Sequence, residues 1–210
     1  MNDTTRESLV RAGRELFARH GFDGASVRAI TRQAGTNLGA ITYHFGSKQA
    51  LFEAVAASLV QPARERLQAA TRGPGTPLDR IEAMVRAFFE ILFEHPELPQ
   101  LMVHVMLSSS PVPEVGLRTM QANVGLLASL IREGQEDGSV RPGDPQLMAL
   151  SVAAQPLWLA LARRMLREGI ALDLKEPETR TDLVASVVTF VRAALSVQAE
   201  SAGAEHPEID

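Results

Sequence analysis

The segment that most constrains the fold is residues 26–52, SVRAITRQAGTNLGAITYHFGSKQALF. Its small and apolar residues recur at helical spacing in two short runs. Gly35 separates the two runs, and Gly46 ends the second, because glycine readily adopts the positive φ that terminates a helix. Ser26 and Ser47 stand where helices would begin, and serine is a favourable N-cap. The segment therefore predicts two short helices joined by a tight turn, followed directly by a third helix.

Two short helices joined by a glycine turn form a helix-turn-helix unit, whose second helix fits the major groove of DNA. Thr36 and Asn37 are expected to cap that second helix, and Ile41 and Phe45 are expected to form its apolar face. The outward positions carry mainly small or hydrogen-bonding groups, as a surface that contacts bases and phosphates requires: Thr36, Asn37, Leu38, Gly39, Thr42, Tyr43 and His44. The segment therefore predicts a surface that binds double-stranded DNA.

Phosphate contacts are expected from the polar groups at the edge of this surface. Tyr43 and His44 are expected to donate to phosphate oxygens; the alternative for Tyr43 is packing at the domain surface. Lys48 lies in the first turn of the third helix, where a cation opposes the helix dipole, and a phosphate beside that N-terminus removes the conflict. Arg28 is expected to reach a phosphate or the groove edge. Leu38 either touches a thymine methyl group or is an ordinary exposed leucine.

Base recognition is expected from three other side chains. Thr36, Asn37 and Thr42 are the candidates, because Asn can pair with adenine and Thr can meet a thymine methyl group. Gly39 either lets the backbone approach the duplex or lets two helices pack closely, and the sequence leaves both open.

Residues 35–51 read GTNLGAITYHFGSKQAL, with a glycine-rich start and a Tyr-His-Phe-Gly-Ser-Lys run. This pattern resembles the signature of the TetR family of bacterial transcriptional regulators (TetR/AcrR type). The similarity continues upstream through LVRAGRELFARHGFDGASVRAI and covers about residues 6–55, a quarter of the chain. The resemblance implies an all-helical homodimer with an N-terminal three-helix DNA-binding domain and a larger effector-binding and dimerising domain. Leu38 and Thr42 depart from the commonest family pattern, which leaves the operator sequence open.

Charge is unevenly divided along the 210 residues. The whole chain carries a net charge of −4, but residues 1–50 carry +3 and the remainder carries −7. The basic end can bind phosphates while the acidic remainder limits indiscriminate association with DNA. The chain has no cysteine, which excludes disulfides, thiolate metal sites and cysteine nucleophiles.

Helical periodicity continues through the whole chain, and no alternating run indicates a sheet. The fold class is therefore all-α, with about nine helices. Beyond the helix-turn-helix segment, helices are expected at about 5–20, 47–70, 78–94, 97–109, 113–137, 144–169 and 177–198. We expect a helix-turn-helix domain at 1–50, an effector-binding and dimerisation domain at 51–198, and a disordered tail at 199–210. The helix at 47–70 is the one element expected to connect the two domains.

Apolar side chains, several methionines and the single tryptophan gather in the larger domain. They suit an adaptable apolar pocket for a small-molecule effector, although each of them could instead belong to an ordinary packed core. The expected lining is Phe88, Phe89, Leu92, Met102, Met106, Leu127, Trp158 and Leu161. Pro156 is expected to kink its helix and open space. Arg163 or Arg164 either holds an effector carboxylate or faces solvent.

The two C-terminal helices, at about 144–169 and 177–198, carry continuous apolar faces. The first face consists of Leu147, Leu150, Ala153, Ala154, Leu157 and Leu161, and the second of Leu183, Val184, Val187, Val188, Val191 and Leu195. A helix pair that meets its symmetry mate gives a closed four-helix interface, so we expect a homodimer through these helices. The alternative is that both faces are buried within one subunit.

These features together predict a DNA-binding transcriptional regulator, most simply a homodimeric repressor that a small, largely apolar effector releases from a palindromic operator. Activation instead of repression is left open. The sequence offers no cysteine nucleophile, no HExxH and no phosphate loop, so no enzyme is expected. The alternatives are a helical enzyme or an effector-independent DNA-binding protein.

The remaining expectations concern metals, cofactors and location. The five histidines are scattered without a pair at metal-ligand spacing, so we expect no metal and no cofactor. The N-terminus is polar and no run approaches the 18 or more apolar residues of a membrane span. A cytoplasmic protein without a membrane partner is therefore expected.

Overall fold

The computed structural model describes residues 2–107 and 112–197, which form nine α-helices and no β-strand. The helices are α1 (Asn2–Gly24), α2 (Val27–Gln33), α3 (Gly39–Phe45), α4 (Lys48–Ala70), α5 (Pro77–Glu94), α6 (Glu97–Leu107), α7 (Glu114–Glu136), α8 (Pro145–Ile170) and α9 (Pro177–Leu195). The all-α prediction is confirmed. The ends predicted for the helices at 97–109 and 177–198, and the tail predicted at 199–210, lie outside the described residues.

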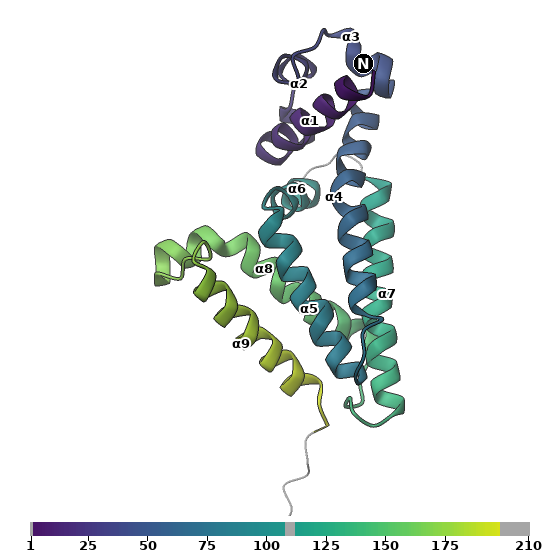
Figure 1. Ribbon diagram of the computed structural model, residues 1–210, viewed down its shortest axis with the longest axis vertical. Coiled ribbons are helices and arrows are strands. Elements are labelled where there is room, and N and C mark those ends of the chain that lie inside the picture. The colour runs from purple at the N-terminus through teal and green to yellow at the C-terminus, as the bar shows by residue number, and fades with distance from the viewer. Residues whose placement is uncertain (1, 108–111, 198–210) are drawn as a thin grey trace, which may run out of the picture.

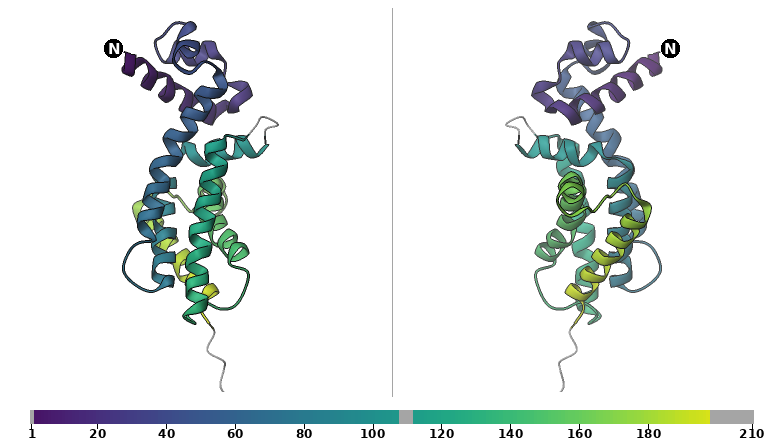
Figure 2. Two further views of the ribbon diagram at one scale, coloured as in Figure 1. Left: turned by 90° about the vertical axis from the view of Figure 1, so that its right-hand side faces the viewer. Right: turned by 90° about the vertical axis from the view of Figure 1, so that its left-hand side faces the viewer.

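The helices form a small N-terminal bundle on one end of a longer helical body (Figure 1). Helices α1 to α3 make up the bundle, and α4 runs out of it along the body beside α7. The most extensive helix pairs are α1 with α6, α7 with α8, and α4 with α7. The side views in Figure 2 show α6 at the upper end of the body, beneath the bundle. Two helices, α4 and α6, therefore connect the body to the bundle.

The core of the bundle forms around α1. Its residues Leu9, Ala12, Leu16 and Phe17 recur at helical spacing, and all four are buried. The ring of Phe52, from the second turn of α4, lies 4.9 Å from that of Phe17 in an edge-to-face arrangement. The start of α4 therefore belongs to the core of the bundle.

Helix α1 is longer than predicted and contains a bend. It extends from Asn2 to Gly24, and Gly21 adopts non-helical angles of φ 68° and ψ −178°. After this bend Phe22 turns back toward the core, where its ring lies 5.2 Å from that of Phe52. The helix end predicted near residue 20 therefore coincides with the bend at Gly21, and not with the end of α1 at Gly24.

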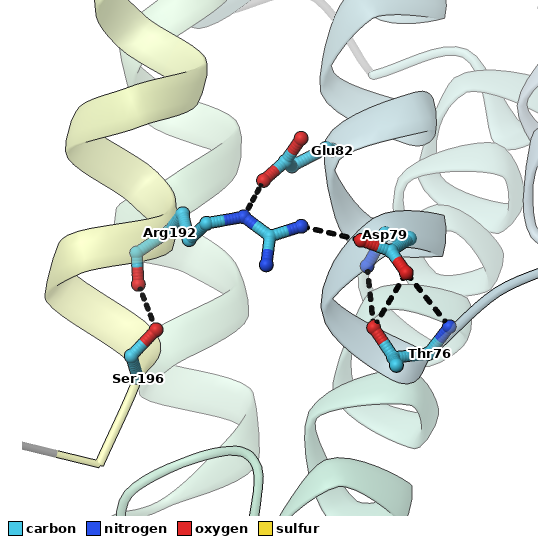
Figure 3. A network of polar contacts seen from close by, with 5 residues as sticks. All are labelled: Thr76, Asp79, Glu82, Arg192 and Ser196. Atoms are coloured by element: carbon cyan, nitrogen blue, oxygen red, sulfur yellow. Dashed lines mark hydrogen bonds and ion pairs between the residues drawn. The ribbon is translucent and has the colours of Figure 1, made fainter.

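The body is centred on α5, whose start is fixed by a capping box. The Asp79 carboxylate accepts hydrogen bonds from the Thr76 backbone N–H (2.9 Å) and hydroxyl (2.8 Å). Arg192 of α9 reaches the same carboxylate and also binds Glu82 (Figure 3). The Thr76 hydrogen bonds, together with Arg192, lower the pKa of Asp79 from 3.8 to about 2. This network attaches the end of α9 to the first turns of α5.

Candidate nucleic-acid interface and ligand cavity

The local signals that predict the helix-turn-helix segment act as expected. Ser26 and Ser47 each accept a hydrogen bond from the backbone N–H three residues later, at 3.1 and 3.0 Å. Gly35 and Gly46 both have positive φ, of 68° and 80°, where α2 and α3 end. The predicted sequence of helix, turn, helix and capped third helix is confirmed.

Helix α3 presents Gly39, Thr42 and Tyr43 to solvent. Its buried side chains are Ala40 and Ile41, which pack into the core of the bundle. The nine residues predicted to contact DNA all lie on the bundle. Six are exposed, namely Arg28, Asn37, Leu38, Gly39, Thr42 and Tyr43. Three are half-buried, namely Thr36, His44 and Lys48.

The start of α3 differs from the prediction. The N-cap residue is Leu38, which makes no side-chain capping bond, so neither Thr36 nor Asn37 caps this helix. The backbone N–H of Thr36 donates to the carbonyl of Thr31 at 2.9 Å, and its hydroxyl approaches the same oxygen at 3.5 Å. Thr36 therefore closes the turn after α2, because the chain needs these residues to reverse direction before α3 begins.

The two explanations for Gly39 can now be separated. A Cβ atom built at Gly39 would approach only the Asn37 side-chain oxygen, at 3.4 Å, and no other helix. Close packing of helices therefore does not require this glycine. A close approach of the backbone to the duplex stays a prediction.

Lys48 lies over an aromatic ring at the edge of this surface. Its Nζ atom is 4.4 Å from the centre of the Phe22 ring, a cation–π distance. Burial lowers the pKa of Lys48 from 10.5, and the nearby Asp23 carboxylate opposes that shift. Arg6 also lies beside this surface, with its guanidinium 5.1 Å from the centre of the Phe45 ring at the end of α3.

A cavity of about 350 Å³ lies between α4, α5, α6, α7 and α8. Three of the eight predicted lining residues, Phe88, Met102 and Leu127, line it. Pro156, inside α8, also forms part of its wall. The volume lies at the lower end of the roughly 300–1,000 Å³ typical of small-molecule sites.

The other five predicted lining residues lie elsewhere, so that part of the prediction is wrong. Phe89 is completely buried in the core, because it points about 100° away from Phe88 on the same helix. Met106 and Trp158 are 74% and 59% exposed, on outward faces of α6 and α8. Leu92 lines a different cavity, and Leu161 is half-buried on a part of α8 that does not reach the apolar cavity.

Sequence reasoning also missed residues that do line the cavity. On α4 they include Val60, Ala63 and Leu67. On α7 the lining residues recur every three or four positions, and they are Gly116, Thr119, Met120, Asn123, Val124 and Leu127. That spacing places them on one helical face, so the signal that could have found them was the periodicity around Leu127.

The cavity that Leu92 lines has a different chemistry. It measures about 420 Å³ and lies where α5 and α8 end and α9 begins. Its basic side chains are Arg163, Arg164, Arg167, Lys175 and Arg180. Arg163 and Arg164 therefore do not line the apolar cavity. The two alternatives for them, an effector carboxylate or solvent, stay predictions.

The apolar faces of α8 and α9 are used differently. On α9, Val187, Val188, Val191 and Leu195 are buried within the subunit, so the predicted interface stripe packs inside the chain instead. On α8, Leu147 is 64% exposed, and Trp158 lies on the same outward side three turns later. Other large apolar side chains exposed on these two helices are Leu150, Met165, Ile170 and Phe190.

Helix α8 is also long and apolar enough to span a membrane, judged by length and composition alone, which is weak evidence. About a third of its apolar stretch is buried in the subunit. In the described ranges, no group of three His, Asp or Glu side chains could hold a metal ion.

Helix α6 provides a second connection between the cavity and the bundle, which the sequence did not predict. Met102 lines the cavity, and His104 lies two residues later against α1. A Cβ atom built at Gly21 would lie 3.1 Å from His104 Nδ1. Arg14 of α1 also forms an ion pair with Glu97 of α6, at 3.6 Å. The expectation that the helix at 47–70 alone connects the domains is therefore wrong.

Comparisons with known proteins agree with this arrangement. Residues 9–55 match the family described as bacterial regulatory proteins, tetR family, and residues 77–191 match the tetracyclin repressor-like C-terminal domain. The chain is similar to the HTH-type transcriptional regulator UidR of Escherichia coli K12, with 27% identity over 141 residues, 66% of this chain and 70% of UidR. It is also similar to the HTH-type transcriptional repressor NicS of Pseudomonas putida, with 27% identity over 190 residues, 86% of this chain and 87% of NicS.

Solved structures share the fold. The ketosteroid transcriptional regulator KstR2 of Mycobacterium tuberculosis matches 92% of this chain and 95% of its own, with a TM-score of 0.71 and 20% identity. A tetR-family regulatory protein from Rhodococcus RHA1 matches 93% of this chain and 98% of its own, with a TM-score of 0.77 and 15% identity. The family matches cover most of the chain, including both the helix-turn-helix bundle and the body. The chain therefore belongs to the TetR family of bacterial transcriptional regulators, which bind DNA and are not enzymes.

Proposed function

We propose that this regulator is a cytoplasmic homodimeric repressor that a small, largely apolar effector releases from a palindromic operator. The observation that carries this proposal is that α4 and α6 both line the apolar cavity and both contact the DNA-binding bundle. A ligand that displaces either helix would therefore move α3. In this division of labour, residues 1–50 bind DNA and residues 51–198 bind the effector and the second subunit.

The outward surface of α3 supports the assignment of DNA contacts. Asn37, in the turn before α3, and Thr42, on α3, are both exposed and are the proposed base readers. Tyr43, which is 73% exposed, is proposed to contact phosphates together with His44 and Lys48. Of the remaining residues, Arg28 is proposed to contact phosphate, Gly39 to permit close approach, Leu38 to meet a thymine methyl group, and Thr36 to position the turn.

The exposed apolar side chains of α8 and α9 support a dimer. Leu147, Trp158 and Phe190 are each more than half exposed, and single subunits rarely leave such large apolar groups uncovered together. A second copy that packs on the same helices would cover them in a self-complementary interface. This interface also accounts for the apolar composition of α8 without a membrane.

Release of DNA requires coupling between the cavity and the bundle. A dimer reads two half-sites at a fixed separation, of about one helical turn or a multiple. Displacement of α4 or α6 changes that separation, so effector and operator are expected to bind antagonistically. A coupling free energy of about 1–3 kcal/mol is typical of such systems.

Selection of binding sites from a random duplex library tests the DNA-binding half of this proposal. The enriched motif should be an inverted repeat with half-sites about one helical turn apart. Asn37→Ala should reduce the preference for that motif over random DNA while leaving the affinity for random DNA unchanged. An enriched motif without two-fold symmetry would contradict a dimeric reader.

Release by a panel of small apolar compounds tests the effector half. Fluorescence anisotropy with the selected operator should show release of the wild-type protein by at least one compound. Ala153→Phe narrows the cavity and should abolish that release, whereas Ala69→Phe, on the exposed side of α4, should not. Equal release of both variants would show that the compound acts outside this cavity.

A further inference from the structure

We infer that the basic cavity where α5 and α8 end and α9 begins is a second ligand site, and that it takes a small organic anion with a doubly charged acid group and an apolar body. Figure 1 shows the junction of α8 and α9 on the side of the body away from α4 and α7. The site is separate from the apolar cavity, so the inference does not depend on the function proposed for that cavity.

The charge of this cavity is opposite to that of the domain around it. The chain after residue 50 carries a net charge of −7, yet five basic side chains and one acidic side chain, Asp173, line this cavity. The Asp173 carboxylate already accepts a hydrogen bond from the backbone N–H of Lys175, at 2.9 Å. Like charges gathered around one cavity repel one another, and a bound anion relieves that repulsion.

Acidic partners neutralise only part of this basic set. Glu168 pairs with both Arg164, at 3.0 Å, and Arg167, at 3.6 Å. Within the ranges that the structure describes, the other three basic side chains form no ion pair, and they are Arg163, Lys175 and Arg180. A ligand with two negative charges therefore suits the site better than one with a single charge.

Arg180 is held in position to bind such a ligand. Its Nε atom donates to the carbonyl of Leu174, and its guanidinium lies 5.0 Å from the centre of the Phe93 ring. Its terminal nitrogens, Nη1 and Nη2, have no hydrogen-bond partner in the described part of the chain and are open to solvent. A planar guanidinium fixed in this way can donate to two oxygens of one acid group at once.

The floor of the cavity is apolar. Its lining includes Leu92, Ala160 and Leu174, which are all buried. The ring of Phe93 belongs to the same wall. An aromatic or aliphatic body would cover these groups, so a ligand that has one should bind more tightly than a bare inorganic ion.

The proposed dimer leaves this site open. Arg167 follows Trp158 by nine residues, and at about 100° of rotation per residue the two side chains point to opposite sides of α8. Trp158 belongs to the outward apolar face that a second copy would cover, whereas Arg167 lines the basic cavity. The cavity face of α8 therefore remains accessible to a small molecule.

Three probes with the same aromatic ring test this inference by isothermal titration calorimetry on the full-length protein. They are phenyl phosphate, which is doubly negative, benzoate, which is singly negative, and benzyl alcohol, which is neutral. At low ionic strength phenyl phosphate should bind at least about tenfold more tightly than benzoate, and benzyl alcohol should not displace it. Inorganic phosphate, which lacks the ring, should also bind at least about tenfold more weakly than phenyl phosphate.

Variants assign the binding to this cavity. Arg180→Met keeps an unbranched stem beside Phe93 but removes the guanidinium, and it should weaken phenyl phosphate binding at least about tenfold. If that variant does not fold, the exposed pair Arg163→Gln and Lys175→Gln should together weaken binding about fivefold. Arg132→Gln is the matched control, because it removes the same charge from an exposed position on α7, and it should leave binding unchanged.

A variant of the apolar cavity separates the two sites. Ala153→Phe narrows the apolar cavity and should leave phenyl phosphate binding unchanged. Loss of binding in this variant would place the anion in the apolar cavity and overturn the inference. Equal effects of Arg180→Met and Arg132→Gln would also overturn it, because they would show a general attraction to positive charge. If phenyl phosphate does not bind the wild-type protein, the second site is wrong, and the proposed apolar effector site is unaffected.

Discussion

Replacement of Gly21 by alanine should destabilise the protein through the junction between α1 and α6. Gly21 has φ 68° and ψ −178°, a combination that is essentially restricted to glycine. Forcing a side chain into such a region costs about 1–3 kcal/mol. The new Cβ atom would also lie 3.1 Å from His104 Nδ1, which is tighter than ordinary contact, so the imidazole would have to shift.

The expected effect is large enough to measure by thermal unfolding. In a chain of this size, 1 kcal/mol corresponds to about 2–4 °C in Tm, so Gly21→Ala should lower Tm by about 2–12 °C. Circular dichroism at 222 nm follows the loss of helix. Gly125→Ala is the matched control, because Gly125 lies in α7 with open space around its Cα, and alanine there should raise Tm slightly.

A double variant separates the two causes. If backbone strain dominates, adding His104→Ala to Gly21→Ala should not restore Tm. If the contact with the imidazole dominates, the double variant should recover most of the loss. A Gly21→Ala protein that melts within 1 °C of wild type would refute the reasoning, because the backbone at residue 21 would then tolerate a side chain without cost.

Three further outcomes are expected. Lys48→Ala should lower the slope of log affinity against log salt by about 1, equally on operator and random duplexes, and an unchanged slope would remove the phosphate role. The pKa of Asp79 is about 2 in the folded protein against 3.8 in the unfolded chain, so its contribution to stability is complete above pH 3.8 and is lost as the pH falls toward 2. Asp79→Asn should therefore flatten the acid end of the plot of unfolding free energy against pH, measured by urea unfolding. Phe190→Glu should shift the protein from dimer to monomer in sedimentation velocity, whereas Thr189→Glu, beside it on α9, should shift the equilibrium less.

The helix-turn-helix segment was predictable because its signals are local. Ser26 and Ser47 cap helices through hydrogen bonds to the third following residue, and Gly35 and Gly46 end helices through their own φ angles. Each signal acts within one helical turn, so the sequence contains all of it. The exception is the start of α3, where the turn closed by Thr36 delays the helix to Gly39.

The cavity was only partly predictable because empty space is a property of several helices at once. Periodicity identifies which residues face inward. It does not tell that Phe88 lines the cavity while its neighbour Phe89 is buried in the packed core. Trp158 looked like a pocket residue from its apolar neighbours, yet α8 presents it outward. The same limit applies to α9, whose valines pack within the subunit, because the sequence does not indicate which helix receives an apolar face.

The buried residues of helix α3 are Ala40 and Ile41, and this small buried face has an evolutionary consequence. Exposed positions such as Asn37 and Thr42 can change with little effect on folding, since substitutions at such sites usually alter stability by less than about 0.5 kcal/mol. After a gene duplication, two copies could therefore acquire different operators through a few substitutions on this helix and in the turn before it. The residues that line the cavity lie on other helices, so each copy could change the genes it controls while still responding to the same chemical signal.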